Sequence, residues 1–367
     1  MIQINNTPSE RLLSLDFFRG FTMLLLLIES TSLYDLLVSP KLEGTWIHTI
    51  GKQFHHHEWH GLLFWDLIQP FFMFIVGVAL YLSYQQRTKR GDSYNTILKH
   101  ICLRSILLLL LGWWLYCMTS GKIVFYFQNV LAQLAVTTFI AFLIIRKPPF
   151  VQIAISIVLL GISEILYRTF WIDGFNQSFI AGHNFGTWLD TLVKGEDKAG
   201  HWVSFNAIPT TAHTIWGVLA GKLLMGLKSK KQKLLILLIA GIACLIIGYG
   251  LDTVTPIIKR IATSTFVFAS GGWTLIMLAF SFYAIDMLKI RRGIEPFKVI
   301  GMNSLFIYLF FNIGGNIMCK QIGFPFSKLA LGWAGELSVN ICTSLIASFL
   351  MWYLCYWMYK QRIFIKI

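Results

Sequence analysis

A histidine cluster that leads into an apolar stretch carrying Asp66 is the part of this sequence best suited to chemistry. The cluster reads His55-His56-His57-Glu58-Trp59-His60. Histidine is the side chain best suited to take up and release protons near neutral pH. A carboxylate within a membrane-length helix costs roughly 2.5–3.5 kcal/mol on insertion scales, so we expect Asp66 to face a partner or a wet cavity. The sequence therefore predicts the functional site where the cluster and Asp66 meet.

The same cluster contains residue types that bind metals, but their spacing is unfavourable. His56 and His60 are four residues apart and could share one helical face with Glu58 nearby. Three adjacent histidines cannot all point at one ion on regular structure, and the HExxH spacing is absent. The six cysteines lie singly, without CxxC spacing. We therefore predict no metal site.

Charged residues also occur in the first apolar stretch. Asp16 and Arg19 are three residues apart, so they share a helical face and can form an ion pair. Arg19 could instead bind a phosphate, because a guanidinium fork fits phosphate oxygens. Both interpretations stay open. Glu29 lies deeper in the same stretch, and with Asp66 on the next helix it could line one cavity.

The composition predicts an all-α polytopic membrane protein. Of the 367 residues, 56% are hydrophobic and 13% are charged, and the mean hydropathy is +0.65. About 20 helical residues cross the roughly 30 Å hydrocarbon core of a bilayer. We predict ten such spans, at residues 12–37, 62–84, 97–118, 124–145, 149–168, 205–226, 233–250, 262–288, 297–319 and 335–358. The whole chain, 1–367, would form one membrane domain with outer loops at about 38–61 and 169–204.

The net charge of +14 indicates orientation rather than a nucleic-acid partner. Basic residues follow every second predicted span, as after Tyr84 and after Met225, and they do not form one patch. By the positive-inside rule, both termini and these basic loops are cytoplasmic. The first span has no small-residue cleavage site after a short apolar core, so we expect it to be retained.

With this orientation, eight of the nine histidines, all but His100, fall on the outer side. Most of the polar residues within the predicted spans also lie toward that side. The outer segment 168–205 mixes aromatic residues with carboxylates and amides, which suits either carbohydrate contact or an interfacial helix. Polar contacts between helices explain some of the buried polar residues. Their concentration on one side favours a cavity there.

Several motifs, in order along nearly the whole chain, resemble the membrane-bound acetyltransferases related to heparan-alpha-glucosaminide N-acetyltransferase, particularly their bacterial homologues. Leu15 to Gly20 is similar to the family's L-D-x-F-R-G opening. His56 to Leu62 and Asp66 to Gly77 are similar to its H-x-x-W-x-G-L and D-L-x-x-P-x-F-x-F-x-x-G blocks. Shorter matches follow at Asn129-Val130-Leu131, Pro256 to Lys259, Thr263 to Phe266, Gly271-Gly272 and Gly301 to Leu305.

The resemblance implies transfer of an acetyl group from cytoplasmic acetyl-CoA to an amino sugar, or glycan, on the far side of a membrane. The family's catalytic histidine precedes the tryptophan by three and maps onto His56. We expect Asp66 to orient the His56 imidazole. Family members often carry an asparagine near the outer end of helix 1, where this chain has Glu29. An acidic group there could orient a glucosamine ammonium or accept its proton, so Glu29 joins the catalytic candidates.

The remaining site candidates are assigned from their predicted positions. Those for the acetyl donor are Arg19, Asp16, Asn129, Ser264 and Asn303, and those for the acceptor are Trp59, His60, Lys259 and His213. Direct transfer and a two-step route through acetyl-His56 both fit the residues. The expected host is a bacterial inner membrane, and a homodimer is left open.

Two other functions stay open. Proton-coupled sugar transporters also use intramembrane carboxylates and histidines, although the inverted repeats and broken helices typical of carriers are not evident. Membrane O-acetylation of a polysaccharide is the second alternative.

Overall fold

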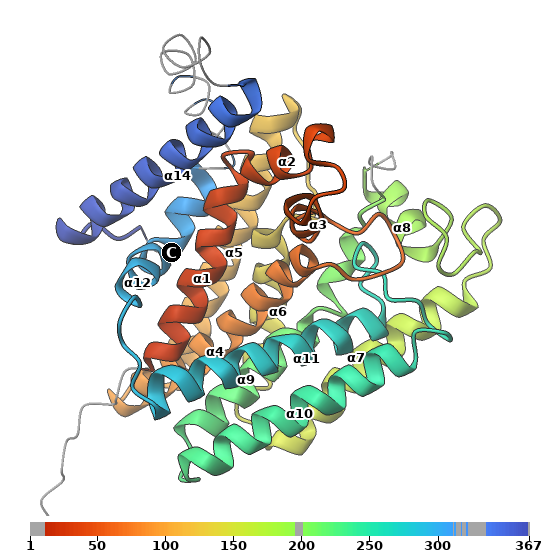
Figure 1. Ribbon diagram of the computed structural model, residues 1–367. Helices are drawn as coiled ribbons and strands as arrows, with labels where there is room; N and C mark the ends of the chain where they lie inside the picture. The colour runs from red at the N-terminus through yellow and green to blue at the C-terminus, as the bar shows by residue number, and fades with distance from the viewer. Residues whose placement is uncertain are drawn as a thin grey trace, which may run out of the picture.

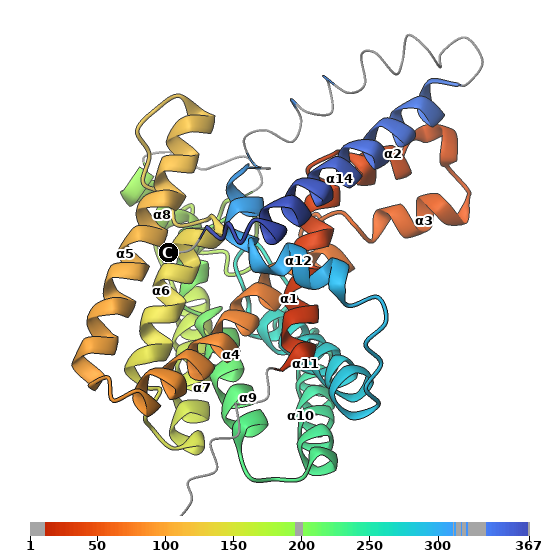
Figure 2. The same cartoon turned by 90° about the vertical axis from the view of Figure 1, so that its left-hand side faces the viewer.

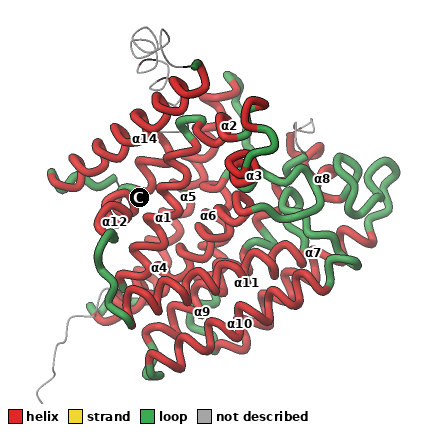
Figure 3. Tube along the Cα trace, in the orientation of Figure 1, coloured by secondary structure: helices red, strands yellow, loops and turns green. Residues whose placement is uncertain are grey.

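In a computed structural model, the chain forms a bundle of long helices with loops and short helices gathered at one end (Figure 1). The structure describes residues 12–194, 201–310, 312, 317, 321 and 335–365. Within this part of the chain, helices alternate with loops and no strand occurs (Figure 3). The prediction of an all-α fold is confirmed for it.

Among the described residues, six helices are long and apolar enough to cross a membrane. They are α4 (Ile68–Lys89), α5 (Tyr94–Ser120), α7 (Pro149–Thr169), α10 (Lys230–Gly250), α11 (Ser264–Ser281) with its π-helical continuation Phe282–Met287, and α14 (Glu336–Lys360). Large apolar side chains such as Ile153, Ile246 and Phe349 are exposed on the outer faces of these helices. Such faces suit lipid, where the helix satisfies its own backbone. The chain is thus a helical membrane protein, while ten spans and cytoplasmic termini stay predictions.

Shorter helices complete the bundle. They are α1 (Leu13–Glu29), α6 (Val130–Leu143), α9 (Thr211–Met225) and α12 (Glu295–Met302). Helix α14 packs against α1 and α12, and Figure 2 shows it lying obliquely across them. The C-terminal part of the predicted span 297–319 falls mostly outside the described residues.

Backbone contact without intervening side chains joins α4 to α9. A Cβ added at Gly77 would lie 2.1 Å from the Thr214 carbonyl oxygen, and one added at Gly217 would lie 2.1 Å from the Phe74 oxygen. Small residues permit such close approach, which replaces the hydrophobic driving force that lipid does not supply. Because α4 begins two residues after Asp66, this contact helps to hold Asp66 in position.

Short elements cover the end of the bundle that carries the histidine cluster. They are α2 (Leu33–Leu37), the 3₁₀ turn Pro40–Leu42, α3 (Trp46–Lys52), α8 (Phe185–Lys194) and the 3₁₀ turn Ser204–Ala207. Figure 1 shows α2, α3 and α8 at this end of the bundle. Two irregular loops, 55–63 and 251–263, lie among them. We call this the histidine end of the bundle.

The first predicted span, 12–37, was too long. Helix α1 ends at Glu29, because the Ser30 and Thr31 hydroxyls bond back to the carbonyls of Leu27 and Ile28 at 2.7 and 2.8 Å. Ser32 then adopts a left-handed φ of 57°. Side-chain bonds of this kind compete with helix continuation. The break leaves Glu29 in the last turn of α1.

Three other boundaries also differ from prediction. Asp66 lies in the 3₁₀ turn Phe64–Leu67 that precedes α4, so it is not within the α-helix itself. Helix α6 begins at Val130 and not near residue 124, since the Asn129 side chain caps it by accepting a hydrogen bond from Ala132 N at 2.8 Å. Helix α9 begins at Thr211, after Pro209 and a 3₁₀ turn, and not at 205.

Gly77→Ala tests the α4–α9 contact. The added methyl group must push the two backbones apart, and overpacking of this kind typically costs about 1–3 kcal/mol. We expect a lower melting temperature of the purified protein in detergent. Gly161→Ala on α7 is the control, because its Cβ meets nothing within 4 Å and alanine favours a helix over glycine. Equal melting temperatures for the Gly77→Ala protein and the wild type would contradict the proposed close packing.

Candidate functional site

The structure brings His56, Asp66 and Lys259 together at the histidine end. His56 Nδ1 lies 2.9 Å from Asp66 Oδ1. Lys259 Nζ lies 3.4 Å from the same carboxylate oxygen and 3.2 Å from His56 Nδ1. The side chains of Asp66 and Lys259 are 1% and 7% exposed, whereas that of His56 is 40% exposed. A buried ion pair therefore supports an accessible imidazole.

The turn that holds Asp66 also satisfies its second carboxylate oxygen. Asp66 Oδ2 accepts hydrogen bonds from the backbone N–H groups of His57 at 3.2 Å and Leu63 at 3.0 Å. These bonds close the loop 55–63 onto the start of α4. A buried carboxylate needs such donors, since an unpaired buried charge is strongly destabilising. The loop conformation and the charge of Asp66 therefore depend on each other.

This contact geometry assigns the hydrogen atoms of the imidazole. A carboxylate only accepts hydrogen bonds, so His56 Nδ1 carries the hydrogen and donates it to Asp66. Lys259, which only donates, then interacts with the Asp66 oxygen rather than with Nδ1. The lone pair of the neutral imidazole is left on Nε2, at the ring edge away from Asp66. That is the arrangement required of a general base or of an imidazole nucleophile.

Lys259 reaches the site from a loop that is far away in sequence and is tied to the histidine cluster. Asp252 Oδ1 accepts hydrogen bonds from His60 Nε2 at 2.9 Å and from Ile257 N at 2.8 Å. Gly61 N donates to the Ile257 carbonyl at 2.8 Å. His60 therefore helps to join the loops 55–63 and 251–263. This junction keeps the loop that carries Lys259 next to the histidine cluster.

Trp202 covers the other side of the three residues. Its ring centroid lies 5.3 Å from that of His56, edge to face, and 5.6 Å from Lys259 Nζ. Gln128 donates hydrogen bonds to the Trp202 carbonyl and to Asp190 Oδ2. The distance to Lys259 suits a cation–π contact. An aromatic wall thus limits water around the imidazole.

Burial and charge together hold His56 in its neutral form at pH 7. Burial is the largest influence that lowers the pKa of His56, and the Lys259 ammonium lowers it further, while the Asp66 carboxylate opposes both. Burial also lowers the pKa of Lys259 from 10.5 to about 8, against the opposing effect of Asp66. At pH 7 the site therefore contains a neutral imidazole between a carboxylate and an ammonium.

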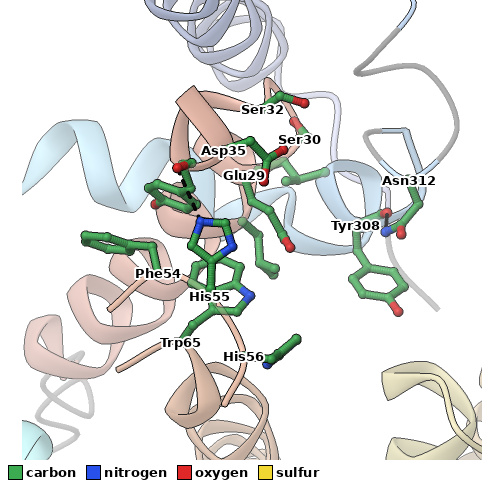
Figure 4. Close-up of a pocket in the computed structure, with 13 residues that line it drawn as sticks. Glu29, Ser30, Ser32, Asp35, Phe54, His55, His56, Trp65, Tyr308 and Asn312 are labelled. Carbon is green, nitrogen blue, oxygen red and sulfur yellow. Dashed lines mark hydrogen bonds between the residues drawn. The ribbon is translucent and has the colours of Figure 1, made fainter. Parts of the chain in front are cut away.

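Two adjoining cavities meet at His56, with volumes of about 370 and 460 Å³. The two cavities share six lining residues, namely Leu26, Glu29, His56, Trp65, Tyr308 and Asn312. The smaller cavity, which we call the outer cavity, continues past polar residues of the histidine end, namely Ser30, Ser32, Asp35 and His55. Figure 4 shows Glu29 extending from α1 into the space between His55, His56 and Tyr308.

The larger cavity, which we call the inner cavity, continues between α4, α5 and α6. Its apolar lining consists of Leu26, Trp65, Ile68, Phe72, Leu115 and Val130. The amide side chains of Gln69, Gln128 and Asn129 face the same space, with Lys259 and Trp202 beside His56. The site is therefore open to two spaces of different character.

One known protein family matches more than half of this chain. The family model described as heparan-alpha-glucosaminide N-acetyltransferase, catalytic, matches residues 11–250. The chain belongs to this family. The match includes α1, the histidine cluster, Asp66 and the aromatic segment with Trp202.

Two curated relatives carry the name heparan-alpha-glucosaminide N-acetyltransferase. The human protein is 24% identical over 97% of this chain and 60% of its own length, and the mouse protein is 23% identical over 100% of this chain and 62% of its own. The chain thus spans about 60% of the length of these relatives.

Some other predicted site residues lie near the site but have structural partners. Trp59 Nε1 donates to the Phe179 carbonyl at 2.7 Å, which ties the histidine cluster to the outer segment. Asn129 lines the inner cavity, while its amide donates to Gly112 O at 2.9 Å. His60 pairs with Asp252, as described above. Neither His60 nor Trp59 lines a cavity at His56.

Further candidates lie away from both cavities. Ser264 donates to Glu164 Oε2 at 3.0 Å between α11 and α7, and His213 is buried with its Nε2 3.0 Å from Ser270 Oγ. Asn303 ends α12, donating to Ile363 O at 3.1 Å. Arg19 forms the predicted pair with Asp16 at 3.2 Å. None of these residues lines the space around His56.

Several lining residues were missed from the sequence, namely Gln69, Gln128, Trp202, Tyr308 and Asn312. Trp202 lies in the outer segment that was singled out for its aromatic content. Gln69 lies inside the D-L-x-x-P block, three residues after Asp66. Tyr308 and Asn312 carry no local signal, because their position depends on how the chain after α12 packs against α1.

Lys259→Met and Asp66→Asn should move the pKa of His56 in opposite directions. Removing the ammonium makes the imidazolium easier to form, so the pKa should rise in Lys259→Met, and it should fall in Asp66→Asn. The measurement is an NMR pH titration of ¹⁵N-histidine-labelled protein, with the signal assigned by its loss in His56→Gln. Lys298→Met, which removes a lysine of α12, is the control. An unchanged midpoint in Lys259→Met would contradict this electrostatic assignment.

Proposed function

We propose that this protein transfers the acetyl group of acetyl-CoA to the amino group of a glucosamine-type sugar presented at the histidine end. One observation carries the proposal: His56, oriented by Asp66, lies where an apolar inner cavity and an acidic outer cavity meet. Donor and acceptor can then reach one imidazole from two sides. Membership of the heparan-alpha-glucosaminide N-acetyltransferase family supports the same chemistry.

The inner cavity fits the thioester arm of the donor. The arm of coenzyme A is a thin chain with two amide groups, and the cavity offers apolar walls from Leu26, Phe72 and Leu115. The side-chain oxygens of Gln69 and Gln128 add hydrogen-bond acceptors. A mostly apolar space with a few placed polar groups is typical of ligand sites. Coenzyme A would bring the activated acyl group as a thioester.

The outer cavity fits a cationic acceptor. Glu29 and Asp35 both line it, so two carboxyl groups face the same space. Serine hydroxyls and Asn312 add the neutral polar groups that sugar hydroxyls require. An ammonium group binds a carboxylate through charge-assisted hydrogen bonds. Glu29 lines both cavities, so an amine held there would lie beside His56 and close to the acyl group.

His56 can then serve the reaction at two points. The bound ammonium first gives one proton to the Glu29 carboxylate, which leaves a free amine. As this amine forms the new C–N bond at the carbonyl carbon, His56 Nε2 takes its second proton and returns that proton to the sulfur when the C–S bond breaks. Asp66 keeps the hydrogen on Nδ1 and stabilises the imidazolium. Lys259 opposes the imidazolium charge, which makes the proton easier to return. The direct route and the route through acetyl-His56 both use this geometry.

The acidic outer cavity favours an amine over the alternatives. An O-acetyltransferase acts on neutral hydroxyl groups, which gain little from two carboxylates beside the base. A proton-coupled transporter would also use Glu29 and His56. Family membership and the apolar inner cavity beside His56 favour transfer.

His56→Ala tests the catalytic assignment. General acid–base catalysis by a side chain typically contributes 10²–10⁴-fold, so kcat for acetyl transfer to glucosamine should fall by about that factor. The assay follows radiolabelled acetyl-CoA with purified protein, together with acetate release and covalent label on the protein. His48→Ala on α3, which lines neither cavity, should keep wild-type activity. Activity of His56→Ala within threefold of wild type would exclude the assignment, and sugar transport without acetylation would favour a transporter.

Glu29→Gln tests the acceptor site separately. Losing a charged hydrogen bond of about 1.5–3 kcal/mol should raise KM for glucosamine by roughly ten- to a hundredfold. The KM for acetyl-CoA should stay within twofold. Asp173→Asn, an exposed outer carboxylate that lines neither cavity, is the matched control. An unchanged glucosamine KM in Glu29→Gln would mean that another group recognises the acceptor, without affecting the assignment of His56.

A further inference from the structure

A third cavity of about 450 Å³ lies at the end of the bundle opposite His56. Leu12 and Leu13, at the start of α1, line it, whereas the cavities at His56 are lined by Leu26 and Glu29 near the end of that helix. A helix rises 1.5 Å per residue, so the two ends of α1 are about 25 Å apart. The rest of the lining comes from Leu224, Met225, Lys230, Lys233, Phe282, Asp286, Lys289 and Arg291. We call this space the basic pocket.

The basic pocket is lined by more positive than negative side chains. Four cationic side chains line it against one carboxylate. Lys230 and Lys233 donate to the carbonyls of Asp286 and Leu224 at 3.0 and 2.7 Å. Lys289 and Arg291 are exposed and make no side-chain hydrogen bond or ion pair with another described residue. The pocket thus offers two cations to an anionic ligand.

The carboxylate in the pocket already has a partner. Asp286 Oδ2 accepts a hydrogen bond from Ser14 N, at the start of α1, at 3.3 Å. Such a bond complements the positive end of the helix dipole. Repulsion between Asp286 and an anion in the pocket is therefore weakened, and the four cations set the sign of the local field.

The backbone around the pocket has two uncommon features. Helix α11 continues as a π-helix over Phe282–Met287, and Lys289 adopts a left-handed φ of 58°. π-Helical turns are rare and frequently occur at functional sites. A left-handed residue other than glycine is strained and needs support from its surroundings. Both features lie in the segment that brings Asp286, Lys289 and Arg291 to the pocket.

We propose that the basic pocket binds the phosphate headgroup of an anionic phospholipid. Its cations face an apolar lining formed by Leu13, Met225 and Phe282, which suits the glycerol and first acyl carbons of a lipid. Large apolar side chains next to the pocket in sequence, Phe280, Leu288 and Ile290, are exposed. Basic pockets between helices at a membrane surface bind anionic lipid headgroups.

The phosphates of coenzyme A are a weaker match for this pocket. The basic pocket shares no lining residue with the inner cavity, which lies between α4, α5 and α6. The basic pocket is formed instead by α1, α9, α10 and the π-helical segment. The proposal is therefore independent of the donor assignment.

Native mass spectrometry of the full chain tests the proposal. The purified protein is titrated with dioleoyl phosphatidylglycerol and, separately, with dioleoyl phosphatidylcholine. We expect tighter binding of phosphatidylglycerol to the wild type, and binding weaker by roughly tenfold or more in Lys289→Gln/Arg291→Gln. The charge-keeping variant Lys289→Arg/Arg291→Lys should bind as the wild type does. Lys89→Gln/Arg90→Gln, on exposed residues at the same end outside the pocket, is the matched control.

Other outcomes would overturn the proposal. Equal binding of the two lipids, or unchanged phosphatidylglycerol binding in Lys289→Gln/Arg291→Gln, would show that these cations recognise no headgroup. Displacement of phosphatidylglycerol from the wild type by adenosine 3′,5′-bisphosphate, at concentrations where inorganic phosphate has no effect, would assign the pocket to the nucleotide of the donor. Melting temperatures of all variants are compared, so that unfolding is not mistaken for lost binding.

Discussion

The burial of one carboxylate, that of Asp66, is the constraint on which the histidine end depends. At 1% exposure it needs every acceptor position filled. The structure supplies two backbone N–H groups from the loop 55–63, the imidazole N–H of His56 and the ammonium of Lys259. These donors come from segments nearly 200 residues apart in sequence. Satisfying Asp66 therefore positions the imidazole and joins the two loops.

The same arrangement explains why His56 is suited to act as a base. An aspartate alone would raise the pKa of a neighbouring histidine, and the imidazole would be partly charged at neutral pH. Lys259 offsets this effect, and burial beside Trp202 lowers the pKa of His56 below its ordinary value. Asp66 thus orients the ring while Lys259 prevents it from being protonated too easily. The ring lines two cavities of different character, an arrangement that suits the proposed transfer between two substrates.

Much of the fold follows from apolar periodicity and length. The helices α5, α7, α10 and α14 lie close to their predicted bounds, because about 20 apolar residues in a bilayer have little alternative to a helix. Predictions failed where polar side chains compete with the backbone. The Ser30 and Thr31 hydroxyls end α1 early, and Asn129 begins α6 late. Hydropathy averaged over a span does not register such single side-chain bonds.

The sequence alone determined the helical membrane class and the family motifs, and it singled out His56, Asp66 and Glu29 as site candidates, because these depend on composition and on short spacings. Only the tertiary structure decided which distant groups join them. Lys259 reaches Asp66 because Asp252, in the same loop, bonds to His60 of the histidine cluster. Ser264 and His213 are also polar and near helix ends, but they contact Glu164 and Ser270 instead. The direction in which a polar side chain points depends on helix packing, and that packing is set by contacts such as Gly77 against Thr214.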